Sequence, residues 1–259
     1  MKKASNTPSG FSRFCYKIIR FCVRVIYPKA TVYGLENLPE EPCILVGNHS
    51  QLHGPVMCEL DLPFDRAIWC AGPMMVREDV ADYAFQDFWS KKPRWCRWFY
   101  RLVSYLIPPL SVCIFNNAHT IAVWRDNRII NTFRQTVNAL QNGANVVIFP
   151  ECYDPHNNIV HAFQENFVDV AKLYCKRSGK AVKFVPLYVA PNLHSLYIGK
   201  PVDYDPEAEP SAQRSRICRE LMDAITQMAT SLPLHTVVPF PNLPKRQHPK
   251  NLPLTEEKE

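Results

Sequence analysis

The sequence of 259 residues predicts a layered α/β domain in which helices flank a mostly parallel central sheet. Three observations support this fold class. Short apolar runs bounded by turn residues recur along the chain, as expected of buried strands. Stretches with helical periodicity separate these runs. Several of the runs end in polar motifs, which is typical of α/β proteins that bind ligands at the carboxyl ends of their strands.

Composition divides the chain into three segments. Residues 1–29 form an amphipathic segment, residues 30–232 the α/β domain, and residues 233–259 a proline-rich polar tail that is expected to be extended. The apolar fraction of 47% is ordinary for a globular protein. A mean hydropathy of −0.20 argues against a protein with several membrane spans. We therefore expect one domain with its own core.

The apolar runs and periodic stretches predict the order of the elements. Strands are expected at residues 30–35, 43–47, 67–71, 111–115, 121–124, 146–149 and 182–190. Helices are expected at residues 11–27, 55–61, 94–107, 127–142, 164–178 and 211–231. Gly143 and Gly179 end two of these helices, because glycine adopts the left-handed conformation common at helix C-termini. Arg77, Glu78 and Asp79 are interpreted as a solvated loop.

The first periodic stretch is both basic and apolar. Residues 1–35 carry seven Lys and Arg residues and no Asp or Glu. In the helix expected at residues 11–27, the basic residues form one narrow stripe, and aromatic and aliphatic residues fill the rest: Arg13, Lys17, Arg20 and Arg24 make the stripe. Such a helix suits the headgroup plane of a membrane, whereas its charges argue against a span. The alternative is a helix packed on the domain with its basic side in solvent.

Residues 94–107 repeat this design, with arginines on one face and Trp95, Phe99 and Leu102 on the other. Aromatic residues of this kind favour the membrane interface. Nucleic acid would have no use for large apolar faces, and the sequence carries no recognition motif for it. The ten cysteines form no C-x-x-C pair, as expected in a reducing compartment. We therefore predict a peripheral or monotopic protein on the cytoplasmic face of a membrane, with membrane lipids as partners.

Polar motifs follow three of the predicted strands. The residues concerned are Asn48-His49 after the run 43–47, Pro150-Glu151-Cys152 after the run 146–149, and Arg125-Asp126 after the run 121–124. If these strands are parallel, a histidine, a glutamate and an arginine meet at one edge of the sheet. A base with a pKa near neutrality, a carboxylate and a fixed cation suit transfer onto a hydroxyl of a phosphate-bearing substrate.

The order of these motifs resembles the glycerolipid acyltransferase superfamily, typified by lysophosphatidic acid acyltransferases. The resemblance covers roughly residues 30–205 and rests on Asn48-His49, Val123-x-Arg125, Phe149-Pro150-Glu151 and Val185-Pro186-Leu187. It implies an α/β domain held at a membrane by amphipathic helices. It also implies acyl transfer from a thioester, on coenzyme A or acyl carrier protein, to the hydroxyl of a lysophospholipid such as lysophosphatidate. It implies no metal and no cofactor beyond the acyl donor.

The resemblance also implies a role for each matching residue. His49 takes the proton from the acceptor hydroxyl, and Asn48 before it is expected to contact the substrate. Arg125 holds the acceptor phosphate, and Glu151 positions the glycerol hydroxyls. Pro186 matches the proline of the last motif.

Two positions depart from the family pattern. The family has an aspartate five residues after the histidine, where this chain has Gly54, so the carboxylate that orients the imidazole is missing. His53 is the candidate replacement as acceptor of the His49 Nδ1 proton, alongside a backbone carbonyl or a carboxylate from another segment. Cys152 stands where the family usually has glycine, and its side chain is expected to narrow the acceptor pocket or alter the turn.

Simpler interpretations compete with these roles. His49 is a structural histidine in one of them, and His49 with His53 is a metal pair in another, although no H-E-x-x-H pattern accompanies it. Arg125 paired with Asp126 would be an ordinary surface ion pair.

Two further functions stay open alongside acyl transfer. Loss of the aspartate favours a lipid-binding protein without turnover. Cys152 with His156 as its base would make a thiol nucleophile, and hence a hydrolase of lipid esters. His119, His161 and His194 receive no role, and His156 receives none beyond that of this base. The sequence predicts neither the acyl donor nor the oligomeric state.

Overall fold

The computed structural model describes residues 9–90 and 92–252. The chain divides into two compact units. The sheet unit comprises Lys29–Ile68 and Phe133–Glu259, and the helical unit comprises Met1–Pro28 and Trp69–Thr132. Strand β3 (Arg66–Ala71) passes from the first unit into the second.

The sheet confirms the predicted fold class. Its other strands are β1 (Thr31–Tyr33), β2 (Ile44–Gly47), β4 (Thr120–Val123), β5 (Asn145–Ile148), β6 (Lys183–Ala190), β7 (Ser195–Ile198) and β8 (Val202–Asp203). They lie in the order β1-β7-β6-β2-β5-β3-β4, with β8 beside β6. Strand β2 runs parallel to β5 and β6, and β3 runs parallel to β5. Only β7 and β8 pair antiparallel with β6 among the described pairings. The sequence analysis did not predict these two short strands.

Strand β2 occupies the centre of the core. Ile44, Leu45 and Val46 are fully buried. A continuous apolar run, rather than an alternating one, is what a strand covered on both faces requires. The register places Val46 opposite Ile148 of β5 and Pro186 of β6. The carboxyl ends of β2 and β5 are therefore level with each other, which brings the residues that follow them together.

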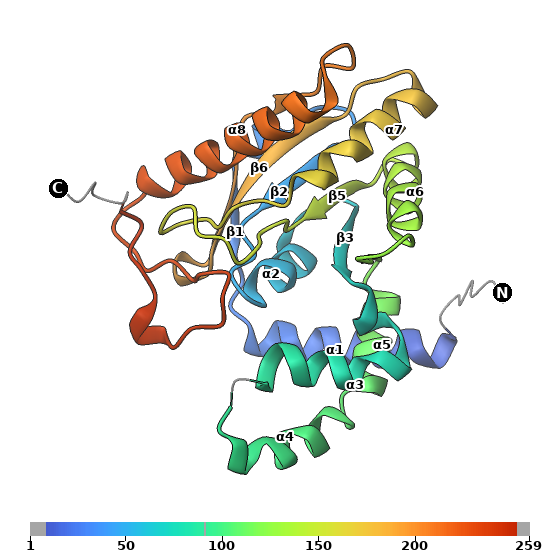
Figure 1. The fold of residues 1–259 in the computed structure, drawn as a ribbon, viewed down its shortest axis with the longest axis vertical. Coiled ribbons are helices and arrows are strands. Elements are labelled where there is room, and N and C mark those ends of the chain that lie inside the picture. Colours follow the sequence, from blue (N-terminus) through green and yellow to red (C-terminus); the bar gives the residue numbers. More distant parts are fainter. Residues whose placement is uncertain (1–8, 91, 253–259) are drawn as a thin grey trace. The chain divides into compact units, whose positions relative to one another are not determined.

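Helices flank this sheet as predicted. Those of the sheet unit are α2 (His53–Asp61), most of α6 (Ile129–Gln141), the short helix η5 (Glu165–Val168), α7 (Asp169–Ser178) and α8 (Pro210–Thr230). Helix α8 packs along β6 (Figure 1). Gly143 and Gly179 adopt the left-handed conformation after α6 and α7, with φ of 88° and 70°. The two predicted helix ends are therefore confirmed.

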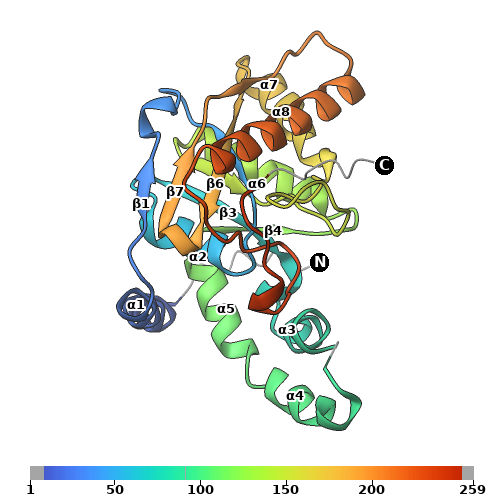
Figure 2. The same ribbon diagram turned by 90° about the vertical axis from the view of Figure 1, so that its left-hand side faces the viewer.

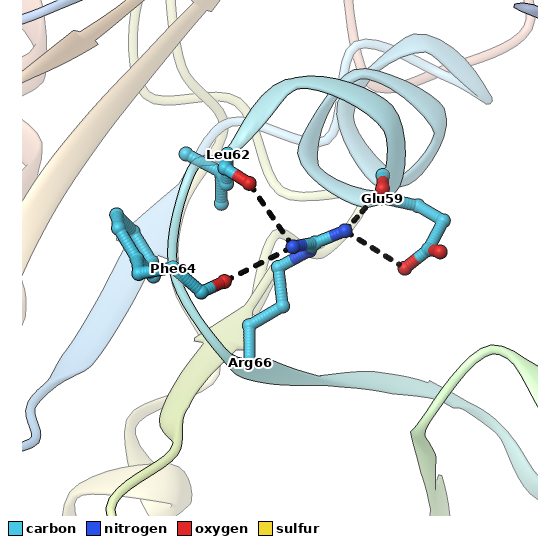
Figure 3. Close-up of polar contacts among 4 residues, drawn as sticks. All are labelled: Glu59, Leu62, Phe64 and Arg66. Carbon is cyan, nitrogen blue, oxygen red and sulfur yellow. Dashed lines mark hydrogen bonds and ion pairs between the residues drawn. The ribbon is translucent and has the colours of Figure 1, made fainter.

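The guanidinium of Arg66 fixes the far end of α2. It donates to the carbonyl oxygens of Leu62 (3.1 Å) and Phe64 (3.0 Å). It also donates to the carbonyl oxygen of Glu59 and forms an ion pair with the Glu59 carboxylate at 3.2 Å (Figure 3). The carbonyl of Glu59 belongs to the last turn of the helix and that of Leu62 to its C-cap, so these bonds supply partners that the helix end itself lacks. Helix α2 is thus held at the end opposite His53.

The helical unit corrects three local predictions. Its elements are α1 (Gly10–Ile26), η2 (Gly72–Met75), α3 (Arg77–Ala84), a π-helical turn η3 (Phe85–Trp89), η4 (Arg94–Cys96), α4 (Arg97–Ser104) and α5 (Pro108–Asn117). The strand expected at residues 111–115 lies inside α5, because Pro108 and Pro109 open a helix that a short apolar run does not reveal. The loop expected at residues 77–79 is the first turn of α3, where acidic residues favour a helix start. The helix expected at residues 94–107 is split between η4 and α4.

Helix α1 packs on α5 (Figure 2), and its partly buried side includes Ser12 as well as the apolar residues Ile19 and Val23. Asn117 donates to the Ser12 hydroxyl at 2.8 Å across this contact. Phe14, Phe21 and Val25 lie on another face and are 61–68% exposed. The helix therefore packs on the helical unit with basic residues such as Arg13 and Lys17 exposed, as the alternative holds, and it also exposes apolar side chains. Its placement at a membrane stays a prediction. Among the described residues no single helix is long and apolar enough to cross a membrane, and only the bent pair Arg94–Ser104 with Pro108–Asn117 meets that test jointly.

The C-terminal segment, residues 233–252, departs from the predicted polar tail (red in Figure 1). His235 and Asn251 are buried, and the His235 amide donates to the Asn251 side chain at 2.8 Å. His235 Nδ1 donates to the Pro233 carbonyl, so its Nε2 accepts from the Tyr188 hydroxyl of β6 at 2.7 Å. A few buried side chains therefore dock a segment whose average composition is polar. The rest of the predicted tail, residues 253–259, lies outside the described residues.

Candidate functional site

Asn48 joins the end of β2 to β6. Its amide donates to the Val189 carbonyl (3.0 Å) and the Ser50 hydroxyl (2.8 Å), and its carbonyl accepts from the Val189 amide (2.7 Å). Asn48 is only 1% exposed. Its predicted contact with substrate is thus replaced, in this structure, by a structural clamp that sets the direction of the chain at His49.

The turn after His49 has no room for the family's aspartate. Ser50 and Gln51 both adopt positive φ, at 48° and 56°. The turn brings the Gly54 amide to the His49 carbonyl at 3.1 Å. A Cβ atom at position 54 would lie 2.5 Å from that carbonyl oxygen and 3.0 Å from the Phe149 ring. The turn as this chain folds it therefore requires glycine at position 54.

The His49 imidazole lies between two aromatic rings. Its centroid is 5.3 Å from that of Phe149 and 5.9 Å from that of Phe240, both in edge-on geometry. Its Nδ1 is buried without a hydrogen-bond partner. Burial lowers the pKa of His49 to about 4, and the nearby Gln51 backbone opposes the shift. The ring is therefore neutral at pH 7 and able to accept a proton.

His53 does not orient His49 as predicted, because the Nδ1 atom of His49 has no partner. His53 instead faces the C-terminal segment. Burial lowers its pKa, and the charges of Lys245 and His248 lower it further. Within the described residues, no cluster of three or more His, Cys, Asp or Glu side chains is placed to hold a metal.

Glu151 meets His49 at the edge of the sheet, as the parallel strands predict. One carboxylate oxygen accepts from the His49 backbone amide at 2.5 Å, and the other accepts from the His161 backbone amide at 2.8 Å. Glu151 is 5% exposed. Burial raises its pKa to about 7, against the effect of the two amides. The carboxylate holds two segments together, while its contact with glycerol hydroxyls stays a prediction.

Arg125 belongs to the helical unit, where it is exposed after β4. The competing ion pair with Asp126 is not formed, because Asp126 pairs with Arg128 at 2.7 Å. Arg125 makes no hydrogen bond or ion pair with the residues that the structure describes, although its charge lowers the pKa of Asp87, against the larger opposing effect of desolvation. Its predicted role in phosphate binding stays a prediction.

Cys152 and Pro186 have local structural environments. The Cys152 thiol lies 3.2 Å from the Ala162 carbonyl oxygen and 3.5 Å from the Asp154 carboxylate, rather than against the exposed His156. The predicted thiol and base pair is therefore not assembled. Pro186 lies inside β6, and its carbonyl accepts from the Gly199 amide at 2.9 Å. Its missing N–H faces the gap between β7 and β8, where a strand tolerates proline.

Phe240, which received no role from the sequence, links the His49 ring to two further rings. The Phe240 ring contacts His49 and also lies 5.2 Å from Tyr153 and 5.9 Å from His161, between centroids. The Nδ1 atom of His161 is buried and lacks a hydrogen-bond partner, like that of His49. The loop that returns from Glu151 brings His161 here, and the C-terminal segment brings Phe240. No local sequence pattern signals either contact.

Fold and site together define an α/β protein with a partly buried histidine, of lowered pKa, at the carboxyl edge of its sheet. The acyltransferase family model matches residues 29–190, a range that contains His49, Arg125, Glu151 and Pro186. The chain therefore belongs to the acyltransferase family, which confirms the resemblance found in the motifs.

Among solved structures the chain is similar to the 1-acyl-sn-glycerophosphate (LPA) acyltransferase PlsC from Thermotoga maritima, with 16% sequence identity and a TM-score of 0.44. The similarity covers 82% of this chain and 80% of that one. Comparison with curated proteins finds no match.

Proposed function

We propose that this acyltransferase moves a fatty acyl group from a thioester of coenzyme A or acyl carrier protein to the hydroxyl of a lysophospholipid such as lysophosphatidate. The observation that carries the proposal is His49, a neutral imidazole at the position of the family's histidine. Because its pKa is about 4, His49 is unprotonated across the physiological range. The same low pKa makes it a weak base, so the rate depends on holding both substrates in one geometry.

In the proposed reaction His49 accepts the proton of the acceptor hydroxyl as that oxygen attacks the thioester carbonyl. The tetrahedral intermediate then collapses, the carbon–sulfur bond breaks, and the leaving thiolate takes the proton from His49. Arg125 is the proposed partner of the acceptor phosphate, since its guanidinium is exposed and makes no ion pair with the described residues.

The proposed location is the cytoplasmic face of a membrane, and two helices of the helical unit support it. On α1 the residues Phe14, Phe21 and Val25 are exposed, and on η4 and α4 the rings of Trp95 and Trp98 are 79% and 71% exposed. Exposed apolar surface of this extent marks an interaction site, and aromatic residues beside arginines suit the headgroup region. The acceptor's acyl chain resides in the same region.

A second candidate, lipid binding without turnover, is favoured by one observation. The Nδ1 atom of His49 has no partner to orient the ring, and Gly54 leaves no place for the usual carboxylate. Loss of an orienting carboxylate costs about 10⁴-fold in rate in a serine protease triad. This candidate predicts lipid association with no release of thiol.

The test measures thiol release from an acyl-coenzyme A, with and without lysophosphatidate, on the wild-type protein and the His49→Ala variant. His156→Ala is the matched control, because His156 is an exposed histidine of the same unit. We expect acceptor-dependent release that His49→Ala abolishes and His156→Ala leaves unchanged, with an acid limb of the pH profile near 4. Acceptor-independent release would indicate a hydrolase. No release, also with acyl carrier protein as donor and other lysolipids, would favour lipid binding alone.

A further inference from the structure

His161 is a partly buried titratable side chain that the proposed function leaves unused. Its backbone amide and that of His49 bind the two oxygens of the same Glu151 carboxylate. Its ring and that of His49 each lie 5.9 Å, between centroids, from the ring of Phe240. Two histidines from segments distant in the sequence are thus held at one place by one carboxylate and one aromatic ring.

The His161 ring carries a polar atom with no partner. Its Nδ1 is buried without a hydrogen bond. A buried donor or acceptor left unsatisfied destabilises the folded protein. Such groups are rare in native proteins, so the atom calls for an explanation, and a catalytic role is one of them.

The loop that carries His161 is held rigidly. The Asn157 side-chain carbonyl accepts from the amides of Ile159 (2.8 Å) and Val160 (2.9 Å), and its amide donates to Thr226 of α8 (2.8 Å). On the other side, the Cys152 amide donates to the Ala162 carbonyl at 2.9 Å. His161 is therefore fixed before any substrate arrives, which is the condition for a catalytic hydrogen bond.

The other polar groups around Glu151 are engaged. The Asn48 amide binds Val189 and Ser50, and the backbone amides of His49 and His161 bind Glu151. The Cys152 thiol faces the Ala162 carbonyl. In the described part of this site, the side chains left with an unused buried nitrogen are the two imidazoles.

We infer that His161 is a second catalytic residue, whose ring N–H donates a hydrogen bond to the thioester carbonyl oxygen as negative charge develops there. The inference rests on the proposed acyl transfer. As the acceptor oxygen bonds to the carbonyl carbon, the carbonyl electron pair moves onto its oxygen, which the His161 N–H stabilises. The acceptor proton goes to His49. When the carbon–sulfur bond breaks, the electron pair returns to the carbonyl, and the thiolate takes the proton from His49.

The test compares three substitutions in acceptor-dependent thiol release. His161→Phe keeps a ring against Phe240 and removes the donor, and we expect kcat to fall about 10²–10³-fold with little change in KM. His161→Asn places an amide near the position of Nδ1, and we expect it to recover at least tenfold of that loss. His156→Phe, at an exposed position, is the control and should leave kcat unchanged. Thermal unfolding of each variant separates loss of catalysis from loss of fold.

The outcomes distinguish this inference from the proposed function. Near-normal kcat in a folded His161→Phe variant, with His49→Ala inactive, would overturn the role of His161 alone. Equal kcat in His161→Asn and His161→Phe would also overturn it, because a hydrogen-bond donor at this position would then have no effect on catalysis. If the wild-type protein releases no thiol with any donor or acceptor, the proposed function fails first and the role of His161 fails with it.

Discussion

The two units of the chain break the usual pattern of burial in opposite ways. In the sheet unit, polar side chains are buried around Glu151, and two imidazole nitrogens lack partners there. In the helical unit, large apolar side chains of α1 and α4 are exposed to solvent. A buried polar group and an exposed apolar patch are the two informative exceptions to the general rule of burial. The first points to a polar reacting group of a ligand, and the second points to an apolar surface such as a membrane.

The largest expected effect concerns the exposed apolar face of α1. The triple variant Phe14→Ser, Phe21→Ser and Val25→Ser removes three side chains that would enter the membrane interface. Burial of each such side chain contributes about 1.5–3 kcal/mol, so binding to lipid vesicles should fall at least 10³-fold. Vesicle co-sedimentation measures this.

The control for that variant removes as much exposed apolar surface from the sheet unit. Leu234, Leu243 and Leu252 are 40–65% exposed, and their replacement by serine should leave vesicle binding unchanged. If both variants lose vesicle binding to the same extent, or if neither loses it, the exposed apolar residues of the helical unit would not differ from those of the sheet unit in binding membranes.

The next effect concerns the pH dependence of stability in the buried site. The pKa of Glu151 is raised to about 7, so its contribution is present below its ordinary pKa of 4.5 and is lost as pH rises through 7. The pKa of His49 is lowered to about 4, so its contribution is present above its ordinary pKa of 6.5 and is lost as pH falls through 4. The contributions of Glu151 and His49 to the free energy of unfolding therefore change in opposite directions between pH 4.5 and 6.5. Each contribution amounts to about 3 kcal/mol, because one unit of pKa shift corresponds to 1.36 kcal/mol.

Single substitutions should reveal the pH dependence of stability that each residue contributes. Urea unfolding of Glu151→Gln should show a free energy of unfolding that rises with pH between 4 and 6.5, because His49 then acts alone. His49→Gln should show one that falls between pH 4.5 and 7. His156→Gln, at an exposed position, should follow the wild type. Two variants with the same slope as the wild type would show that these groups are not buried as described.

A smaller effect is expected at Gly54. Because a Cβ atom there would meet the His49 carbonyl at 2.5 Å, Gly54→Asp should destabilise the protein by about 1–3 kcal/mol, and Gly54→Ala by nearly as much. Gly10→Ala is the matched control, since nothing lies within 4 Å of a Cβ atom at position 10. Thermal unfolding measures the loss. A Gly54→Asp variant that gains activity at unchanged stability would mean that the turn readily adopts the family's conformation.

The smallest effect concerns the basic stripe of α1. Lys17 is exposed, and Lys17→Ala should weaken binding to anionic vesicles by about 1 kcal/mol while leaving binding to neutral vesicles unchanged. Added salt should erase the difference. Equal weakening on both kinds of vesicle would assign Lys17 to packing rather than to charge.

The features that the sequence predicted correctly are those that depend on short continuous stretches of residues. The strand ending before Asn48 and the one ending before Glu151 are continuous apolar runs, and their parallel pairing brings His49 and Glu151 together as expected. The strand predicted at residues 111–115 failed because a short apolar run fits a helix equally well.

Contacts between distant segments were beyond such reasoning. His161 reaches the site through a loop held by Asn157, and Phe240 reaches it through a segment docked by His235. The lack of space at Gly54 depends on the positive φ of Ser50 and Gln51, which no residue type there requires.

The Glu151 carboxylate joins the backbone of His49, 102 residues away in the sequence, to that of His161. The length of one side chain therefore sets the spacing between the two imidazoles. Aspartate at position 151 would withdraw the carboxylate by about 1.5 Å, the length of one carbon–carbon bond. Both histidines would then have to follow it or lose their anchor. Glu151 is in this sense a spacer, and its length is a means of adjusting the candidate site without altering either histidine.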